Sequence, residues 1–104
     1  MSSQDAFITL INASAATAMK HKQAALSLIQ RTETPRTKSA HIAAQAAAYR
    51  AEKAIALFEE ALNFPQAARA ADMMEAGLVH LDMCEKHLDR VNDLLFGIEG
   101  ISVA

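Results

Sequence analysis

The sequence predicts an all-α fold, an antiparallel up-down-up bundle of three long helices. Alanine, leucine, glutamine, lysine and glutamate, which favour helix, are abundant, whereas β-branched residues are sparse. Apolar residues recur at alternating spacings of three and four, which is the repeat of one helix face. Only three glycines and two prolines are present, and the prolines divide the chain into thirds. The breaks at these prolines are short, and short loops make neighbouring helices antiparallel.

The first helix is expected at about residues 4–31. One apolar stripe runs along it and consists of Phe7, Ile11, Ser14, Ala18, His21, Ala25 and Leu28. A second stripe widens the apolar face and consists of Ile8, Ile11, Ala15, Met19, Leu26 and Ile29. A helix with so wide an apolar face is expected to bury it against its neighbours.

The second helix is expected at about residues 35–62. Thr34 and Pro35 predict its start, because threonine caps helix N-termini and proline suits the first helical position. Its apolar stripe consists of Ala44, Ala48, Ala51, Ile55, Phe58 and Leu62. The first half of this helix is unusually rich in alanine. Such small residues let other helices approach closely, or leave space that another group fills.

The third helix is expected at about residues 65–96. Pro65 pushes Phe64 into an extended conformation and then suits the first helical position. The apolar stripe consists of Ala70, Met74, Gly77, Leu81, Cys84, Leu88, Val91, Leu95 and Ile98. Gly97 suits a terminating position, with Ile98 as the hydrophobic partner of that cap.

These three stripes indicate a single helical-bundle domain over residues 1–104, with residues 99–104 as a loosely ordered tail. A core of this size is modest. Because a helix rich in alanine buries little area per residue, docking of two bundles into a homodimer would cover the surplus apolar surface. A thin monomeric bundle is the alternative.

The net charge of −2 gives no general attraction to nucleic acid or to an anionic membrane, so neither partner is expected. Residues 1–38 are mostly basic and residues 54–104 mostly acidic, which either draws neighbouring helices together or provides a basic end for an acidic partner. No stretch approaches the ~20 apolar residues of a membrane span. Cys84 is the only cysteine, so no internal disulfide is expected, and a cytoplasmic location is predicted.

One cluster of residues suits metal chemistry. His80, Cys84 and His87 share one helix face, and imidazole and thiolate ligands suit zinc, copper or haem iron. Antiparallel packing places His87 beside His41 and brings His21 to a similar level. The candidate metal or haem site therefore consists of His41, His80, Cys84 and His87. In the alternative interpretation, the histidines are satisfied at the edge of the core and the cysteine is a small buried residue.

Enzymatic chemistry has weaker support in the sequence. The Glu-x-x-His motif of di-iron bundles is missing. The acidic pairs of the third helix are Asp72 with Glu75, and Asp82 with Glu85 and Asp89. All-helical nucleotide pyrophosphohydrolases hold magnesium with similar pairs, so a small hydrolase is one alternative. The spacing is also that of a solvated polar helix face, which is the interpretation we adopt.

Two segments resemble parts of known helical families. Residues 49–65 resemble the second helix and closing turn of a tetratricopeptide repeat, but no second copy follows at that family's period of about 34 residues. Residues 84–91 resemble the last helix of microtubule-interacting-and-trafficking domains, although the first helix expected here is longer. Neither resemblance assigns the chain to a family.

The predicted function is that of a non-enzymatic helical interaction protein, an adaptor, chaperone or regulator. It would self-associate and bind a protein partner through an apolar helix face. The candidate partner-binding residues are Ala40, Ala43, Ala47, Met19 and Met83. No cofactor is expected under this interpretation. The alternative is a metal- or haem-binding bundle that uses the histidine and cysteine cluster.

Overall fold

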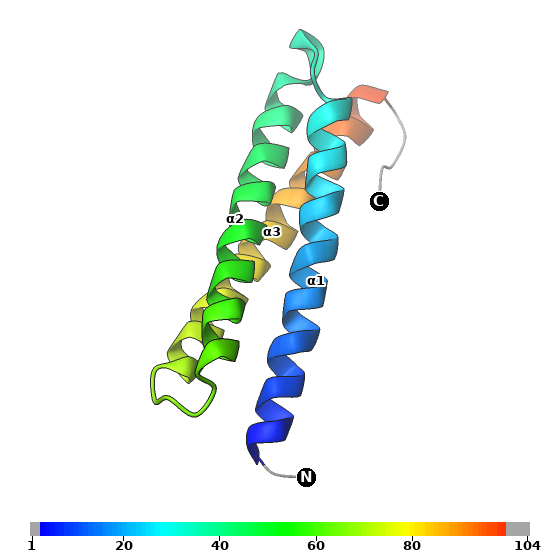
Figure 1. Ribbon diagram of the computed structural model, residues 1–104. Coiled ribbons are helices and arrows are strands. Elements are labelled where there is room, and N and C mark those ends of the chain that lie inside the picture. Colours follow the sequence, from blue (N-terminus) through cyan, green and yellow to red (C-terminus); the bar gives the residue numbers. More distant parts are fainter. Residues whose placement is uncertain (1–2, 100–104) are drawn as a thin grey trace.

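Three long helices packed side by side form most of the described structure (Figure 1). The computed structural model describes residues 3–99. Helix α1 is Ser3–Arg31, a short 3-10 helix η1 is Pro35–Thr37, α2 is Lys38–Asn63 and α3 is Ala70–Glu99. The chain runs up α1, down α2 and up α3, in an elongated body of 50 × 20 × 17 Å. The predicted all-α bundle of three helices is confirmed.

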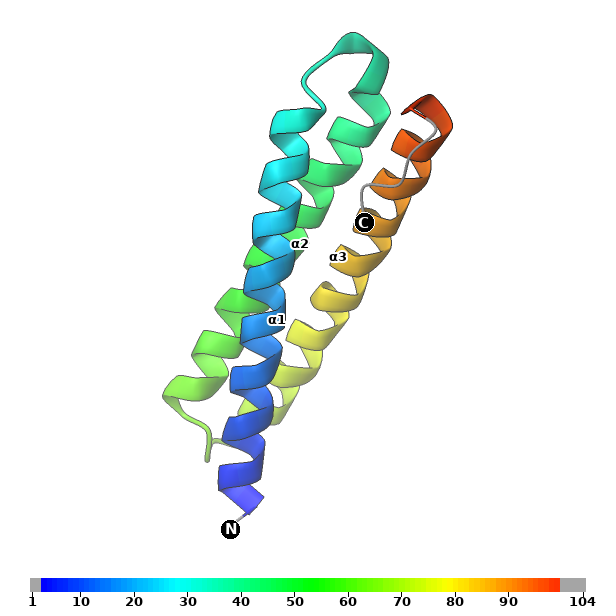
Figure 2. The ribbon, with the colours of Figure 1, turned by 90° about the vertical axis from the view of Figure 1, so that its right-hand side faces the viewer.

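Helix α2 packs closely against both of its neighbours. Its buried residues are Ala40, Ala43, Ala44, Ala47, Ala48, Ala51, Ala54, Phe58 and Ala61. Because a methyl side chain projects little from the backbone, α1 and α3 can both approach α2 closely. Helices α1 and α3 come close to each other at far fewer positions. Figure 2 looks onto the side that α1 and α3 share.

Larger side chains from α1 and α3 fill the centre of the bundle. The buried ones are Ile11, Leu28, Met74, Leu81, Val91 and Leu95. Polar residues occupy most outward positions, so each helix is amphipathic rather than apolar all round. Among the described residues, no helix combines the length and the apolar character that crossing a membrane requires.

Threonine side chains hold the corner between α1 and α2. The Thr34 hydroxyl accepts a hydrogen bond from the Thr37 N–H at 3.3 Å, so Thr34 is a cap as the sequence predicts. Pro35, however, begins the 3-10 helix η1, and α2 begins at Lys38 rather than at Pro35. The Thr37 hydroxyl donates to the Thr32 carbonyl at 2.9 Å, and the Thr32 hydroxyl donates to the Leu28 carbonyl at 2.6 Å. Thr32 and Thr37 are buried, so these bonds satisfy polar atoms that would otherwise destabilise the corner.

The third helix begins at Ala70, later than the start predicted at Pro65. The Ala67 N–H donates to the Phe64 carbonyl, and the Ala70 N–H donates to the Ala67 carbonyl, both at 3.0 Å. These bonds make two successive turns, and Pro65 occupies the second position of the first one. The backbone angle that proline imposes suits that position as well as the start of a helix, so the sequence does not distinguish them.

The predicted helix end at Gly97 is also wrong, because α3 continues to Glu99. No atom outside the neighbouring backbone lies within 4 Å of the place where a Cβ of residue 97 would be. Glycine is tolerated inside this exposed last turn at a cost of up to about 1 kcal/mol relative to alanine. Of the predicted tail, Glu99 is the last helical residue, and residues 100–104 lie outside the described residues.

Gly77 provides the space for Phe58, the largest fully buried side chain of the described core. A Cβ atom at position 77 would lie 2.5 Å from Cε1 and 2.8 Å from Cδ1 of the Phe58 ring. The ring has no exposed surface, so it cannot swing into solvent to make room. This close approach fixes how α3 lies against the lower half of α2.

We predict that Gly77→Ala lowers the free energy of unfolding by about 1–2 kcal/mol, because overpacking outweighs the gain in helix propensity. Gly97→Ala is the matched control, since no side chain faces it, and it should be neutral or slightly stabilising. Urea unfolding of both variants measures the difference. Equal stabilisation by the two substitutions would show that the Phe58 ring has room to move.

Candidate interaction surfaces

His41 and His21 each have a hydrogen-bond partner at the edge of the core. The Thr32 hydroxyl donates to the Leu28 carbonyl, so it accepts from Nδ1–H of His41 at 3.1 Å. His21 Nε2 lies 3.2 Å from Glu85 Oε1, which links α1 to α3. These contacts agree with the interpretation in which histidines at the edge of the core form hydrogen bonds with neighbouring side chains.

His80, Cys84 and His87 lie on α3 but face different surroundings. His80 Nδ1 is 3.0 Å from the guanidinium of Arg50 on α2, Cys84 is fully buried, and His87 lines a hollow at the surface. In the part of the chain that the structure describes, no three histidine, cysteine, aspartate or glutamate side chains are placed to hold a metal ion. The candidate ligands, His41 included, are therefore not brought together.

Cys84 is buried against the alanines of α2. Burial raises the pKa of its thiol to about 11, and the negative charge of Glu85 acts in the same direction. The thiolate, rather than the thiol, is the nucleophile and the metal ligand. The side chain is therefore a small buried residue of the core at neutral pH, without the properties of a reactive cysteine.

We predict that Cys84 makes the folded state less stable at alkaline pH. Its pKa is about 11 when folded, above its ordinary value near 9 when unfolded, so the folded state binds the proton more tightly. Its stabilising contribution is complete below pH 9 and is lost as the pH rises towards 11. Urea unfolding at about pH 8 and about pH 10.5 should show a larger loss in the wild type than in Cys84→Ala. The same loss in both proteins would contradict this assignment.

The three alanines that the sequence suggested for partner binding lie inside the bundle. Ala40 and Ala47 have no exposed surface, and Ala43 is 6% exposed. The chain's own helices α1 and α3 cover Ala40 and Ala47, so a partner could reach those two only if the bundle opened. Ala43 contributes only a small exposed area to a hollow at the surface. Met19 is 45% exposed and Met83 is half-buried. A partner surface on the closed bundle must therefore be built mainly from other side chains.

Exposed apolar side chains lie along the side that α1 and α3 share. Helical periodicity puts Leu10 on the same face of α1 as His21, and puts Leu78 and Phe96 on the same face of α3 as Glu85. The contact between His21 and Glu85 shows that these two faces meet. Leu10 is 52% exposed, Leu78 41% and Phe96 58%. We call these five residues the α1–α3 face.

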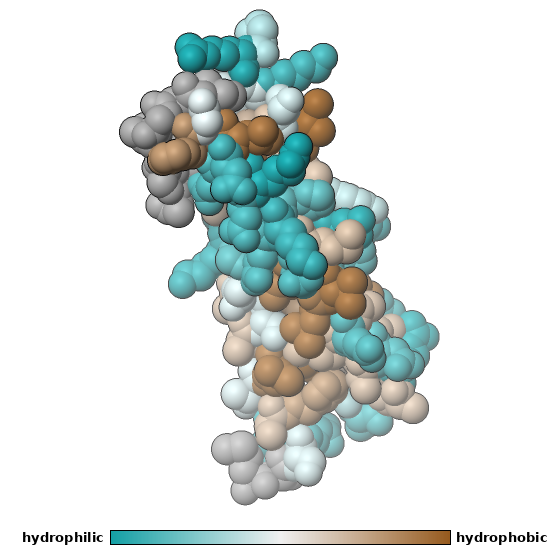
Figure 3. Space-filling view, turned by 180° about the vertical axis from the view of Figure 1, so that it is seen from behind, coloured by the Kyte–Doolittle hydropathy of each residue, from teal (hydrophilic) through white to brown (hydrophobic). Residues whose placement is uncertain are grey.

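A second surface runs between α2 and α3 on the other side of α3. It contains a hollow of about 310 Å³, lined by Ser39, Ile42, Ala43, Ala46, His87 and Arg90. Its large exposed apolar side chains are Ile42, Tyr49 and Val79. We define the α2–α3 face as Ile42, Ala46, Tyr49, Arg50, Lys53, Val79, His80, Met83, His87 and Arg90. Figure 3 views the molecule from behind, where apolar patches interrupt the hydrophilic surface.

The α2–α3 face has a positive charge. Arg50 and Lys53 lie over the Tyr49 ring, with Cζ and Nζ at 5.8 and 5.4 Å from the ring centroid. Burial lowers the pKa of His80, and the charges of Arg50 and Lys53 lower it further. The neutral His80 accordingly accepts its hydrogen bond from Arg50. Within the described residues, neither these two cations nor Arg90 forms an ion pair with a carboxylate.

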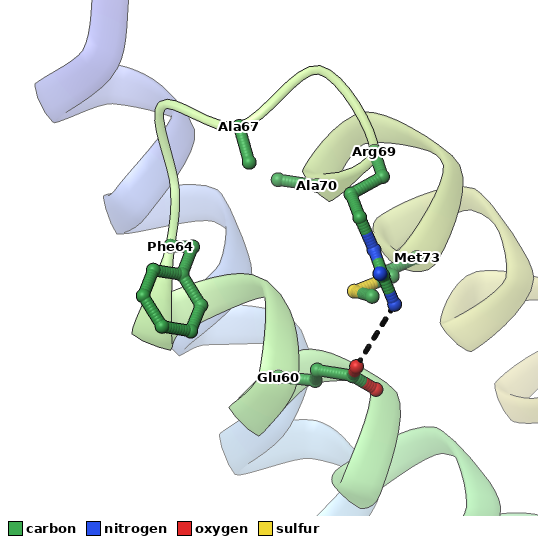
Figure 4. Close-up of a pocket in the computed structure, with 6 residues that line it drawn as sticks. All are labelled: Glu60, Phe64, Ala67, Arg69, Ala70 and Met73. Atoms are coloured by element: carbon green, nitrogen blue, oxygen red, sulfur yellow. Dashed lines mark hydrogen bonds and ion pairs between the residues drawn. The ribbon is translucent and has the colours of Figure 1, made fainter.

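A smaller pocket of about 180 Å³ lies where the loop between α2 and α3 meets both helices (Figure 4). It is lined by Glu60, Phe64, Ala67, Arg69, Ala70 and Met73. Arg69 Nη2 lies 3.1 Å from Glu60 Oε1, and this exposed ion pair ties the loop to α2. The remaining lining is apolar, and the Phe64 side chain is 64% exposed. The pocket therefore extends the apolar surface between α2 and α3 at their lower end.

The sequence pattern does not single out Ile42, Tyr49 and Leu78, which the structure shows to be exposed. Helical spacing does place Ile42 and Tyr49 on one stripe of α2, because Ile42, Ala46, Tyr49 and Lys53 recur at spacings of four, three and four. This stripe lies beside the buried alanine stripe of α2. An abundance of alanine on several sides of the helix concealed it.

The chain matches no protein-family model, no curated protein and no solved structure. The functional conclusions therefore depend on the surfaces described above.

Proposed function

We propose that this chain is a non-enzymatic helical interaction protein that self-associates through its α1–α3 face and binds a protein partner. The observation that carries the proposal is the row of exposed apolar side chains Leu10, Leu78 and Phe96 along one side of a narrow bundle. Removing apolar surface from water contributes about 25 cal/mol per Å². A second copy that covers this row would therefore stabilise both bundles.

The charges of the two helices support this mode of pairing. Helix α1 carries Lys20, Lys22 and Arg31 against Asp5, whereas α3 carries seven acids against two bases. In a dimer whose two-fold axis runs along the helices, α1 of each copy lies over α3 of the other. The basic helix then meets the acidic helix twice, whereas a two-fold axis across the helices would place like charges together.

The side chains best suited to chemistry support a role without catalysis. Cys84 is buried and protonated, and His21 and His41 are engaged by neighbouring side chains. The metal- or haem-binding alternative gains no support from the geometry, because its candidate ligands face different surroundings. A single reduced thiol fits a protein of the cytoplasm, where we place it.

We predict that the mass of the wild type in sedimentation equilibrium rises with concentration from 11.2 kDa towards twice that value. Leu78→Glu should remain at 11.2 kDa, because it places a charge within the apolar contact. Circular dichroism should show the same helix content in both proteins, since Leu78 is 41% exposed in the single chain.

The matched control is Ile42→Glu, which introduces the same charge at an exposed site on the α2–α3 face. It should leave the association constant unchanged. Two results would contradict the proposal: a wild type that stays monomeric up to about 1 mM, where association of about 4 kcal/mol is detectable, or equal loss of association in both variants.

A further inference from the structure

We infer that the α2–α3 face binds an acidic amphipathic helix of a partner protein. This inference rests on the proposed function, because it names the partner that the interaction protein binds. It does not depend on self-association, which uses the α1–α3 face on the opposite flank of α3. The shape of the face and its charge both favour this occupant over others.

The shape of the face suits a helix. Ile42, Ala46, Tyr49 and Lys53 lie on consecutive turns of α2 and span about 17 Å at ~1.5 Å per residue. The hollow lies at the upper end of this stripe, where small Ala46 leaves space between α2 and α3. Exposed Ile42 and Val79 provide apolar contacts on the two helices. A partner helix with apolar residues on successive turns would fit such a surface.

The charge of the face selects an acidic partner. Arg50, Lys53 and Arg90 have no carboxylate partner among the described residues. Two acids of the same helices lie towards α1 instead: Glu52 lies 3.9 Å from Lys22, and Glu85 lies 3.2 Å from His21. Acidic side chains that flank the apolar stripe of a partner helix would therefore meet three cations that no carboxylate of the described residues neutralises.

Other occupants fit the face less well. A second copy docked through the same face would place cations against cations, which disfavours that pairing. Single-stranded nucleic acid stacks its bases on exposed aromatic rings, whereas Arg50 and Lys53 already lie over the Tyr49 ring. The half-exposed Ile42 and Val79 also require an apolar counterpart, which a phosphate backbone does not offer.

Two designed peptides of three heptads, about 21 residues, test the inference. Both carry leucine at the core positions, and the flanking positions are glutamate in one and lysine in the other. Fluorescence anisotropy with the full chain should show at least about tenfold tighter binding of the glutamate peptide, because several exposed ion pairs each contribute modestly. This preference should decrease as salt is added. NMR shifts on binding should cluster at Ile42, Tyr49 and Val79.

Three variants locate the binding and its charge preference. Ile42→Glu should weaken the binding of the glutamate peptide at least about tenfold, since it places a like charge in the contact. Leu78→Glu, on the other face, should leave that binding unchanged. The double substitution Lys53→Glu and Arg90→Glu should reverse the preference in favour of the lysine peptide. This reversal separates loss of charge recognition from loss of folding.

Several outcomes would overturn the inference: equal affinities for the two peptides, NMR shifts centred on Leu78 and Phe96, or tighter binding of a single-stranded oligonucleotide than of the glutamate peptide. Loss of the dimer in Ile42→Glu would instead assign this face to a second copy. A monomeric wild type that still prefers the glutamate peptide would contradict self-association and leave this inference standing.

Discussion

The methyl side chains on the inner side of α2 determine how far apart the three helices lie. Ala44, Ala47, Ala51 and Ala54 have no exposed surface, and α2 lies close to both of its neighbours along its length. Such short side chains cannot fill a wide space, so close approach is the way in which this helix excludes water. The bundle is thus built around a thin central helix that contacts both of its neighbours.

This arrangement makes the sides of the bundle unequal. Helices α1 and α3 are held close to α2 but are more widely spaced from each other, so longer side chains must span their shared side. Ile11 of α1 and Leu95 of α3 are buried inside the bundle, and His21 reaches Glu85 across the shared side. Leu10 and Leu78 remain partly exposed there. On the α2–α3 face, close packing of the two helices brings Arg50 within hydrogen-bond distance of His80. Arg50, Lys53 and Arg90 therefore lie on one surface.

The sequence predicts the helices well because their periodicity and the Thr34–Pro35 cap are local signals. The pairing of residues at the same height on α2 and α3 is predicted less accurately. The antiparallel register that puts His87 beside His41 also puts His80 beside Ala48, whereas the structure places His80 against Arg50. The loop at residues 64–69 explains this difference in pairing. Proline suits a turn as well as the start of a helix, so the sequence does not reveal the length of the loop. A longer loop changes which residues lie at the same height.

The direction in which a side chain of α2 points is harder to predict from the sequence than its position along the bundle axis. Alanine occurs on several sides of α2, so the pattern does not show which alanines face inward. Ala47 is fully buried, while the adjacent Ala46 is half-buried and lines the surface hollow. A rotation of α2 about its axis redirects every residue on it without changing the spacing pattern. For this reason the sequence predicts that His87 lies beside His41, whereas His41 contacts Thr32 and His87 lines the hollow between α2 and α3.

Unfolding measurements on two alanine variants of α2 test most directly whether close packing determines the structure. Ala51 is fully buried between the helices, whereas Ala56 on the same helix is exposed. The account predicts that Ala51→Leu lowers the free energy of unfolding by about 1–3 kcal/mol, because the larger side chain forces the helices apart. Ala56→Leu should change it by less than about 0.5 kcal/mol. An Ala51→Leu protein as stable as the wild type would contradict the account, because it would show unused space between α2 and its neighbours.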